Sequence, residues 1–109
     1  MKKCLFILVG ALLALSACDD DKRPAVFLDE PQMIDVMTDA YLIEAQLNQM
    51  KSMGTDVSDL QAVYYDQLFE HYGITDTVFE QNMAYYTRQP AVLERIMDSV
   101  SNRFIRAQQ

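Results

Sequence analysis

The sequence predicts an all-α fold: a small bundle of about four short helices that follows an amino-terminal signal and a short acidic tether. Beyond residue 28, apolar residues recur every three or four positions, which is the period of an amphipathic helix. No segment there has the pattern of a strand. The chain has 109 residues, half of them hydrophobic, and this length suits one domain, expected over residues 29–109.

The first helix is expected to begin after Asp29, with Gln32 completing a capping box and Pro31 tolerated in the first turn. Leu28 and Met33 are spaced for a hydrophobic staple across this cap. The helix should fade over residues 50–53. Its broad apolar face contains Met33, Val36, Met37, Ala40, Tyr41 and Leu47, with Asp35, Asp39 and Gln46 opposite.

The second helix is expected to begin near Ser58, with Gln61 completing another capping box, and to end at Gly73. Its apolar stripe contains Leu60, Tyr64, Leu68 and Tyr72, widened by Tyr65 and Phe69.

The third helix is expected to begin at Thr75, with Ile74 and Phe79 forming a staple across its cap. Pro90 ends this helix and opens the fourth. The third helix presents Phe79, Met83 and Tyr86 on one face, and the fourth presents Leu93, Ile96, Met97, Val100 and Phe104.

Residues 1–17 have the pattern of a signal peptide. A positive start precedes an apolar run over residues 4–15, which is shorter than the roughly 20 residues that a membrane-spanning helix needs. The run closes with Leu15-Ser16-Ala17-Cys18, which resembles the lipobox of bacterial lipoproteins. The resemblance implies that Cys18 becomes the first residue, carries covalent lipid such as palmitate, and anchors the protein in the outer membrane of the cell envelope.

Residues 18–28 are expected to be the lipidated cysteine and an acidic tether. The run Asp19-Asp20-Asp21 has no apolar period and is typical of a solvated linker. It lacks the turn and the distal Glu of a calcium loop, so we expect no metal there. An acidic run after a lipidated cysteine also resembles the surface-export signal of Bacteroidota lipoproteins. It favours a surface-exposed protein, with a plain periplasmic spacer as the alternative.

The charge balance excludes electrostatic binding to nucleic acid. The chain has 9 Lys and Arg against 16 Asp and Glu. Removal of Lys2 and Lys3 with the signal leaves 7 basic residues and a formal charge of −9. Such a chain is repelled by phosphates and by anionic head groups, so the lipid must hold it at the membrane. Loss of Cys4 with the signal also leaves no second thiol for a disulfide.

The sequence offers few catalytic groups. His71 is the one histidine and cannot build a His-rich zinc site alone, and no serine has a nucleophile-elbow context. We therefore expect no catalytic residue, metal or cofactor. Glu44 lies near the middle of the apolar face of the first helix. It is a candidate ligand contact or, with Asp39, the acid of a hydrolase; the alternative is a structural carboxylate bonded to a Tyr hydroxyl or a helix cap.

Six tyrosines form the other candidate group. Tyr suits interfaces because it joins a large apolar body to a polar tip. The alternative is that the rings fill the core of a domain without Trp. The candidate partner or ligand contacts are Glu44, Tyr64, Tyr72, Tyr85 and Tyr86.

The residues that carry a family resemblance are spread over all four expected helices. They are Met33, Asp39, Glu44, Tyr65, Phe69, His71, Tyr72, Gly73, Ile74, Phe79, Tyr85, Tyr86, Pro90, Leu93, Ile96 and Val100. Together they resemble the uncharacterised Bacteroidota lipoprotein family called domain of unknown function 4296. Asn82 departs from the Ser usual there, and Met97 from the usual Tyr. The family has no established activity, so the resemblance implies fold and location and no catalytic residue.

We therefore expect a lipid-anchored envelope lipoprotein that is not an enzyme. The leading expectation is a protein-interaction module, an accessory subunit that binds another envelope protein. The alternative is a small module at the cell surface that binds a glycan or a peptide.

Overall fold

The computed structural model describes residues 22–109, which form four helices and no strand, as the sequence predicts. The signal peptide, Cys18 and Asp19-Asp20-Asp21 lie outside the described residues. The helices are α2 (Glu30–Ser52), α3 (Ser58–Tyr72), α4 (Asp76–Thr87) and α5 (Pro90–Ala107).

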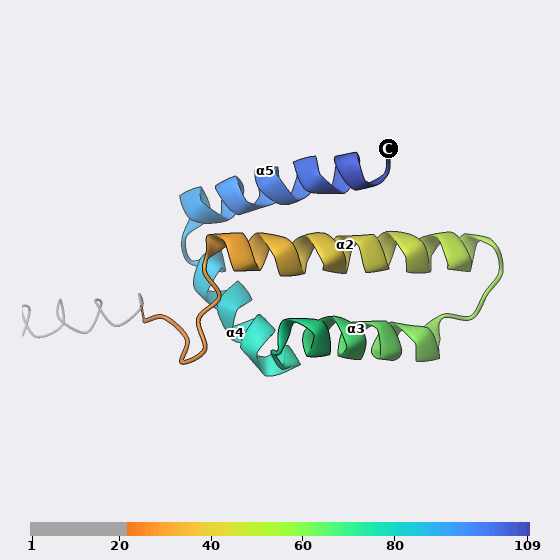
Figure 1. The fold of residues 1–109 in the computed structure, drawn as a ribbon, viewed down its shortest axis with the longest axis horizontal. Coiled ribbons are helices and arrows are strands. Elements are labelled where there is room, and N and C mark those ends of the chain that lie inside the picture. The colour runs from red at the N-terminus through yellow and green to blue at the C-terminus, as the bar shows by residue number, and fades with distance from the viewer. Residues whose placement is uncertain (1–21) are drawn as a thin grey trace, which may run out of the picture.

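Three helices lie side by side in one layer, with α2 between α3 and α5 (Figure 1). The short helix α4 crosses one end of the layer, connects α3 to α5 and packs against α5. Helix α2 is thus covered by α3 on one side and by α5 on the other, and α4 covers one end of the layer. The layer therefore has two broad faces that its own helices cover only in part.

The capping box predicted at the start of α2 is confirmed. The Gln32 N–H donates to Asp29 Oδ1 at 2.9 Å, and the Asp29 N–H donates to Gln32 Oε1 at 3.0 Å. Two of the amide groups that a helix start leaves unpaired are satisfied in this way.

The capping box predicted at Ser58 and Gln61 is wrong. Val57 is the cap residue of α3 and makes no side-chain cap bond. The Ser58 N–H and hydroxyl both donate to Asp56 Oδ1, at 3.1 and 2.7 Å. The ionised carboxylate of Asp56 is a stronger acceptor than the Ser58 hydroxyl. Both bonds lower the pKa of Asp56, and the bond from the Ser58 hydroxyl has the larger effect.

The other helix ends follow the sequence. Gly73 ends α3 with a φ of 66°, a left-handed conformation that glycine adopts without steric cost. Thr75 caps α4 by accepting the Val78 N–H at 3.2 Å, and Pro90 is the first residue of α5.

The main core lies at the end of the layer that α4 crosses. Its buried members are Leu28, Met33, Met37, Tyr85, Tyr86, Ile96 and Val100. Phe79, Met83, Leu93 and Met97 pack against this cluster, so the apolar faces predicted for α4 and α5 are the faces that the structure buries.

The segment just before α2 is attached to the domain. Asn82 of α4 donates to the Val26 carbonyl at 2.9 Å and accepts the Leu28 N–H at 2.8 Å. The Tyr86 hydroxyl donates to the Leu28 carbonyl at 2.6 Å. Residues 26–28, expected to be the end of the tether, are therefore fixed to α4 by groups that would otherwise be buried without partners.

Within residues 22–109, no helix combines the length and the apolar character needed to span a bilayer.

Candidate functional site

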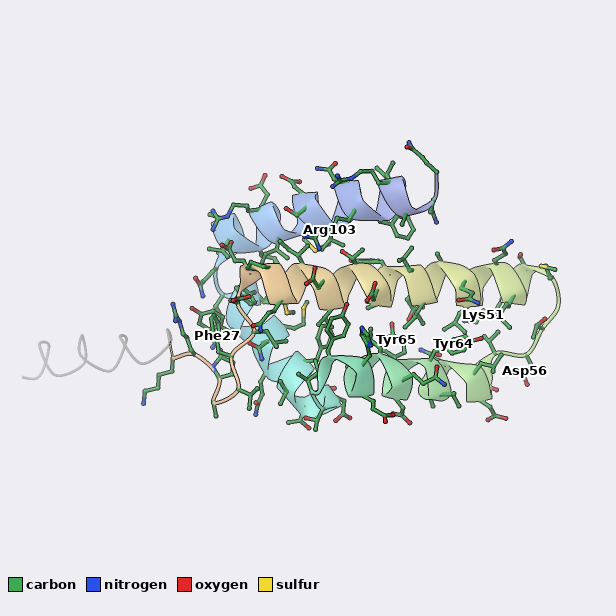
Figure 2. The ribbon with its side chains drawn as sticks, viewed as in Figure 1. Phe27, Lys51, Asp56, Tyr64, Tyr65 and Arg103 are labelled. Carbon is green, nitrogen blue, oxygen red and sulfur yellow. The ribbon has the colours of Figure 1, made fainter. Side chains whose placement is uncertain are left out.

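Two tyrosines of α3 bond to two carboxylates of α2. The Tyr65 hydroxyl donates to Glu44 Oε1 at 2.5 Å. The Tyr72 hydroxyl donates to Asp39 Oδ2 and to the Asp35 carbonyl, the latter at 3.2 Å. Tyr65 and Tyr72 are about two helical turns apart, so both point from one side of α3. In Figure 2, Tyr65 rises from α3 toward α2.

These contacts raise the pKa of both tyrosine hydroxyls. Burial raises the pKa of Tyr65 to about 12, helped by the bond to Glu44 and by its charge. Burial also raises the pKa of Tyr72, helped by the bond to Asp39 and by the charges of Asp39 and Asp35. Both hydroxyls therefore remain donors at neutral pH. The Tyr-bonded arrangement considered for Glu44 is the one observed.

Helix α5 is joined to the opposite side of α2 by two ion pairs. Arg95 pairs with Glu30 at 2.7 Å, and Arg103 pairs with Asp35; Figure 2 shows Arg103 reaching from α5 toward α2. Asp35, on the face opposite the apolar one, is exposed, and Asp39, beside Tyr72, is half-buried. Both carboxylates have partners because α2 lies between two helices, with Arg103 of α5 bonded to Asp35 and Tyr72 of α3 bonded to Asp39.

Two adjacent hollows open along α2 and share Tyr41. The first, here called the Glu44 hollow, has a volume of about 200 Å³ and is lined by α2, α3 and α4. The second, here called the Phe104 hollow, has a volume of about 320 Å³ and is lined by α2 and α5. The lining of the Glu44 hollow is Met37, Ala40, Tyr41, Glu44, Tyr65, Phe79 and Met83; that of the Phe104 hollow is Tyr41, Met97, Val100, Ser101 and Phe104.

The ring of Tyr41 lines both hollows and lies between them. Its side chain is 43 % exposed although it is large and apolar. Its ring meets the Phe104 ring edge-on, with 6.5 Å between centroids. The two hollows and Tyr41 form one surface, here called the Tyr41 surface, in which aromatic and methionine side chains surround one carboxylate.

The predicted contact residues do not gather at one place. Tyr64 lies in a third hollow of about 480 Å³ between α2 and α3, together with Asp39, Gln46, Gln67 and His71. Glu44 lies elsewhere, so Asp39 and Glu44, considered as a hydrolase pair, line different hollows. His71 is exposed, in the last turn of α3, and its ring meets the Tyr72 ring edge-on at 5.0 Å.

Tyr85 and Tyr86 are part of the core, 8 % and 2 % exposed. Burial raises the pKa of Tyr86, whose hydroxyl bonds to Leu28. The two rings also border a small hollow beside Arg23 and Arg95. Of the two alternatives considered for tyrosine, core filling is the one that the structure shows for this pair.

Of the Tyr41 surface, the sequence identifies Glu44 as a candidate contact but not Tyr41 or Phe104. The apolar periodicity puts Tyr41 on the apolar face of the first helix and Phe104 on that of the fourth, which predicts only a packing role for both. The available signal was spacing: Met37, Tyr41 and Glu44 recur at four and three residues and so share one side of a helix. Which side α4 would leave partly uncovered depends on tertiary packing.

Among residues 22–109, no three His, Cys, Asp or Glu side chains are grouped so that they could hold a metal ion.

A comparison with protein families finds one match over the domain. The family model described as "Domain of unknown function (DUF4296)" matches residues 24–109. The chain matches no curated protein and no solved structure. The matched range begins before α2 and so includes the segment that Asn82 holds.

Proposed function

The chain belongs to the DUF4296 family, and within that family we propose that it is a non-catalytic protein-interaction module, an accessory subunit of an envelope assembly. The observation that carries the proposal is the Tyr41 surface. Contiguous apolar surface rimmed by polar groups is typical of protein-binding sites.

The composition of this surface supports a protein partner. Tyr, Phe and Met are enriched in the buried centres of interfaces, and a Tyr between two hollows offers a rigid anchor with little side-chain entropy to lose. Tyr41, Phe104 and Met97 come from two helices, α2 and α5, whose buried residues Met37 and Val100 belong to one core. The surface is therefore preformed, which lowers the cost of binding.

We further propose that the protein is a lipoprotein, anchored by lipid on Cys18 in the outer membrane and facing the cell surface. The lipobox-like sequence and the acidic run after it support this proposal. Two or more acyl chains on one cysteine would hold the chain firmly, since a single chain binds only marginally.

Photo-crosslinking in native envelopes tests the interaction module. The full chain would carry p-benzoylphenylalanine in place of Tyr41, or in place of Val63 as a control. Val63 is 47 % exposed, close to the 43 % of Tyr41, but lies on α3. We expect one reproducible adduct with an envelope protein from position 41 and none from position 63. Equal labelling from both positions, or none from position 41, would count against the proposal.

A second candidate function is a glycan- or peptide-binding module. The observation that favours it is the hollow between α2 and α3, where the Tyr64 ring lies with the amides of Gln46 and Gln67 and with Asp39. Aromatic rings with amide and carboxylate groups suit sugar rings and extended peptides alike. Titration of glycan and peptide libraries would test it: Tyr64→Ala should abolish any binding that Val63→Ala leaves intact.

A further inference from the structure

The Glu44 hollow differs from the Phe104 hollow in holding a charge. Glu44 is half-buried, and its Oε1 accepts the Tyr65 hydroxyl. Among the described residues, the structure records no hydrogen bond or ion pair for its other oxygen, Oε2. A partly desolvated carboxylate with an open oxygen gains from a positive partner more than an exposed one does.

Aromatic rings complete the environment that an organic cation prefers. Tyr41, Tyr65 and Phe79 line the hollow with Glu44. Ring faces attract ammonium and guanidinium groups, and more strongly when water is excluded. The methionines on the wall, Met37 and Met83, offer a polarisable apolar contact for the carbon stem of a long basic side chain.

The chain does not supply this cation from its own described residues. Between residues 30 and 73 it carries eight carboxylates and one basic residue, Lys51. Two arginines of α5 are paired with other carboxylates of α2, Arg95 with Glu30 and Arg103 with Asp35, and Arg106 donates to the Asn102 carbonyl. The charge of this half of the domain therefore complements a basic partner.

We propose that the Glu44 hollow receives a lysine or arginine side chain of the partner protein, while an apolar side chain of the same segment enters the Phe104 hollow. Tyr41 packs between the two inserted side chains. This inference rests on the proposed interaction module and names the chemistry of its partner: a segment with one basic and one apolar residue close together.

A pair of peptides that differ at one position tests the inference. Each carries one leucine and, three residues later, either Lys or Gln. They would be titrated into the full chain in mild detergent, and methionine methyl groups would be followed by NMR. Met37 and Met83 report on the Glu44 hollow and Met97 on the Phe104 hollow. Met53, 76 % exposed at the end of α2, is the internal control.

We expect the Lys peptide to shift Met37, Met83 and Met97 but not Met53, and to bind about fivefold more tightly than the Gln peptide. Glu44→Gln should reduce that preference, because the charge is lost while the amide oxygen can still accept from Tyr65 and the aromatic rings remain. Glu80→Gln, an equal charge change on an exposed residue of α4, should leave it intact. Circular dichroism of each variant would verify that the helices remain folded.

Equal affinity for the two peptides, or a preference that Glu44→Gln leaves unchanged, would overturn the inference. Absence of any methyl shift from either peptide would overturn it as well. The photo-crosslinking result at Tyr41 is independent of these outcomes. A specific adduct there, without a preference for Lys, would retain the interaction module and reject the cationic partner.

Discussion

Leu28 and Asn82, 54 residues apart in the chain, are joined by a 2.8 Å hydrogen bond from the Leu28 N–H to Asn82 Oδ1. The Asn82 side-chain amide also donates to the carbonyls of Val26 and Val78, at 2.9 and 2.8 Å. Asn82 is fully buried, 0 % exposed, and all its side-chain bonds are to backbone groups. One polar side chain thus connects the segment before α2 to the middle of α4.

Replacing Asn82 by Ala should lower the free energy of unfolding by about 2–3 kcal/mol, because the Leu28 N–H and the Val26 carbonyl lose their partner. Urea denaturation of the full chain in mild detergent, followed by circular dichroism, would measure the change. Asn102→Ala is the matched control, since Asn102 is exposed on α5. A loss no larger than that of the control would show that Asn82 does not secure this segment.

Tyr65 should make the stability of the domain fall at alkaline pH. Its pKa is raised from 10.0 to about 12 in the folded chain, so the folded state holds the phenol proton more strongly than the unfolded state does. The stabilisation is fully present below pH 10 and is lost as the pH rises from 10 toward 12. Urea denaturation across this interval would measure the decline.

Two variants separate Tyr65 from the other tyrosines. Tyr65→Phe should reduce the decline between pH 10 and 12 and remove the part of the phenolate absorbance change that is centred near pH 12. Tyr64→Phe should leave both nearly unchanged, since no hydrogen bond is recorded for the Tyr64 hydroxyl among the described residues. An identical pH profile for Tyr65→Phe and the parent would contradict the assignment.

Gly73→Ala should destabilise the domain by roughly 1–2 kcal/mol, the cost of a left-handed conformation for an L-residue. A Cβ at Gly73 would meet no heavy atom within 4 Å, so the cost comes from the backbone and not from a clash. Gly73→Asn should cost less, because Asn tolerates this conformation. Thermal unfolding of the two variants side by side would measure the difference; equal losses would point to another cause.

The ion pair between Arg103 and Asp35 should contribute little to stability. Both side chains are about half exposed, 44 % and 48 %, and exposed pairs are typically worth less than about 1 kcal/mol. A double-mutant cycle with Arg103→Ala and Asp35→Ala should give a coupling energy in that range, which shrinks as salt is raised. A coupling of several kcal/mol, insensitive to salt, would contradict this ranking.

The local features of the fold could be predicted from the sequence because they depend on near neighbours. Asp29 with Gln32, Thr75 before α4, Gly73 after α3 and Pro90 at the start of α5 act within one helical turn. The failure at Ser58 was also local. Asp56 and Ser58 both suit a cap, and spacing alone does not decide which of them accepts the hydrogen bonds.

The contacts between helices were much harder to predict from the sequence. A helical wheel with one buried side puts Asp35 and Asp39 on the opposite, polar face, whereas α2 is covered by both α3 and α5. Tyr72 and Arg103, the side chains that bond to them, belong to segments far away in the chain. In the sequence, Asn82 is notable only because the family that the chain resembles usually has Ser at this position. Its role in holding residues 26–28 depends on how closely that segment approaches α4.

The attachment of residues 26–28 to α4 also has a mechanical consequence. If lipid on Cys18 holds the chain, only seven residues lie between the anchor and Val26, and this segment spans roughly 25–30 Å at full extension. Tension between the membrane and a bound partner would reach the domain at Val26 and Leu28. Asn82 and Tyr86 would transmit that load to α4 and the core. The first turn of α2 would therefore stay folded when the segment between Cys18 and Val26 is fully extended.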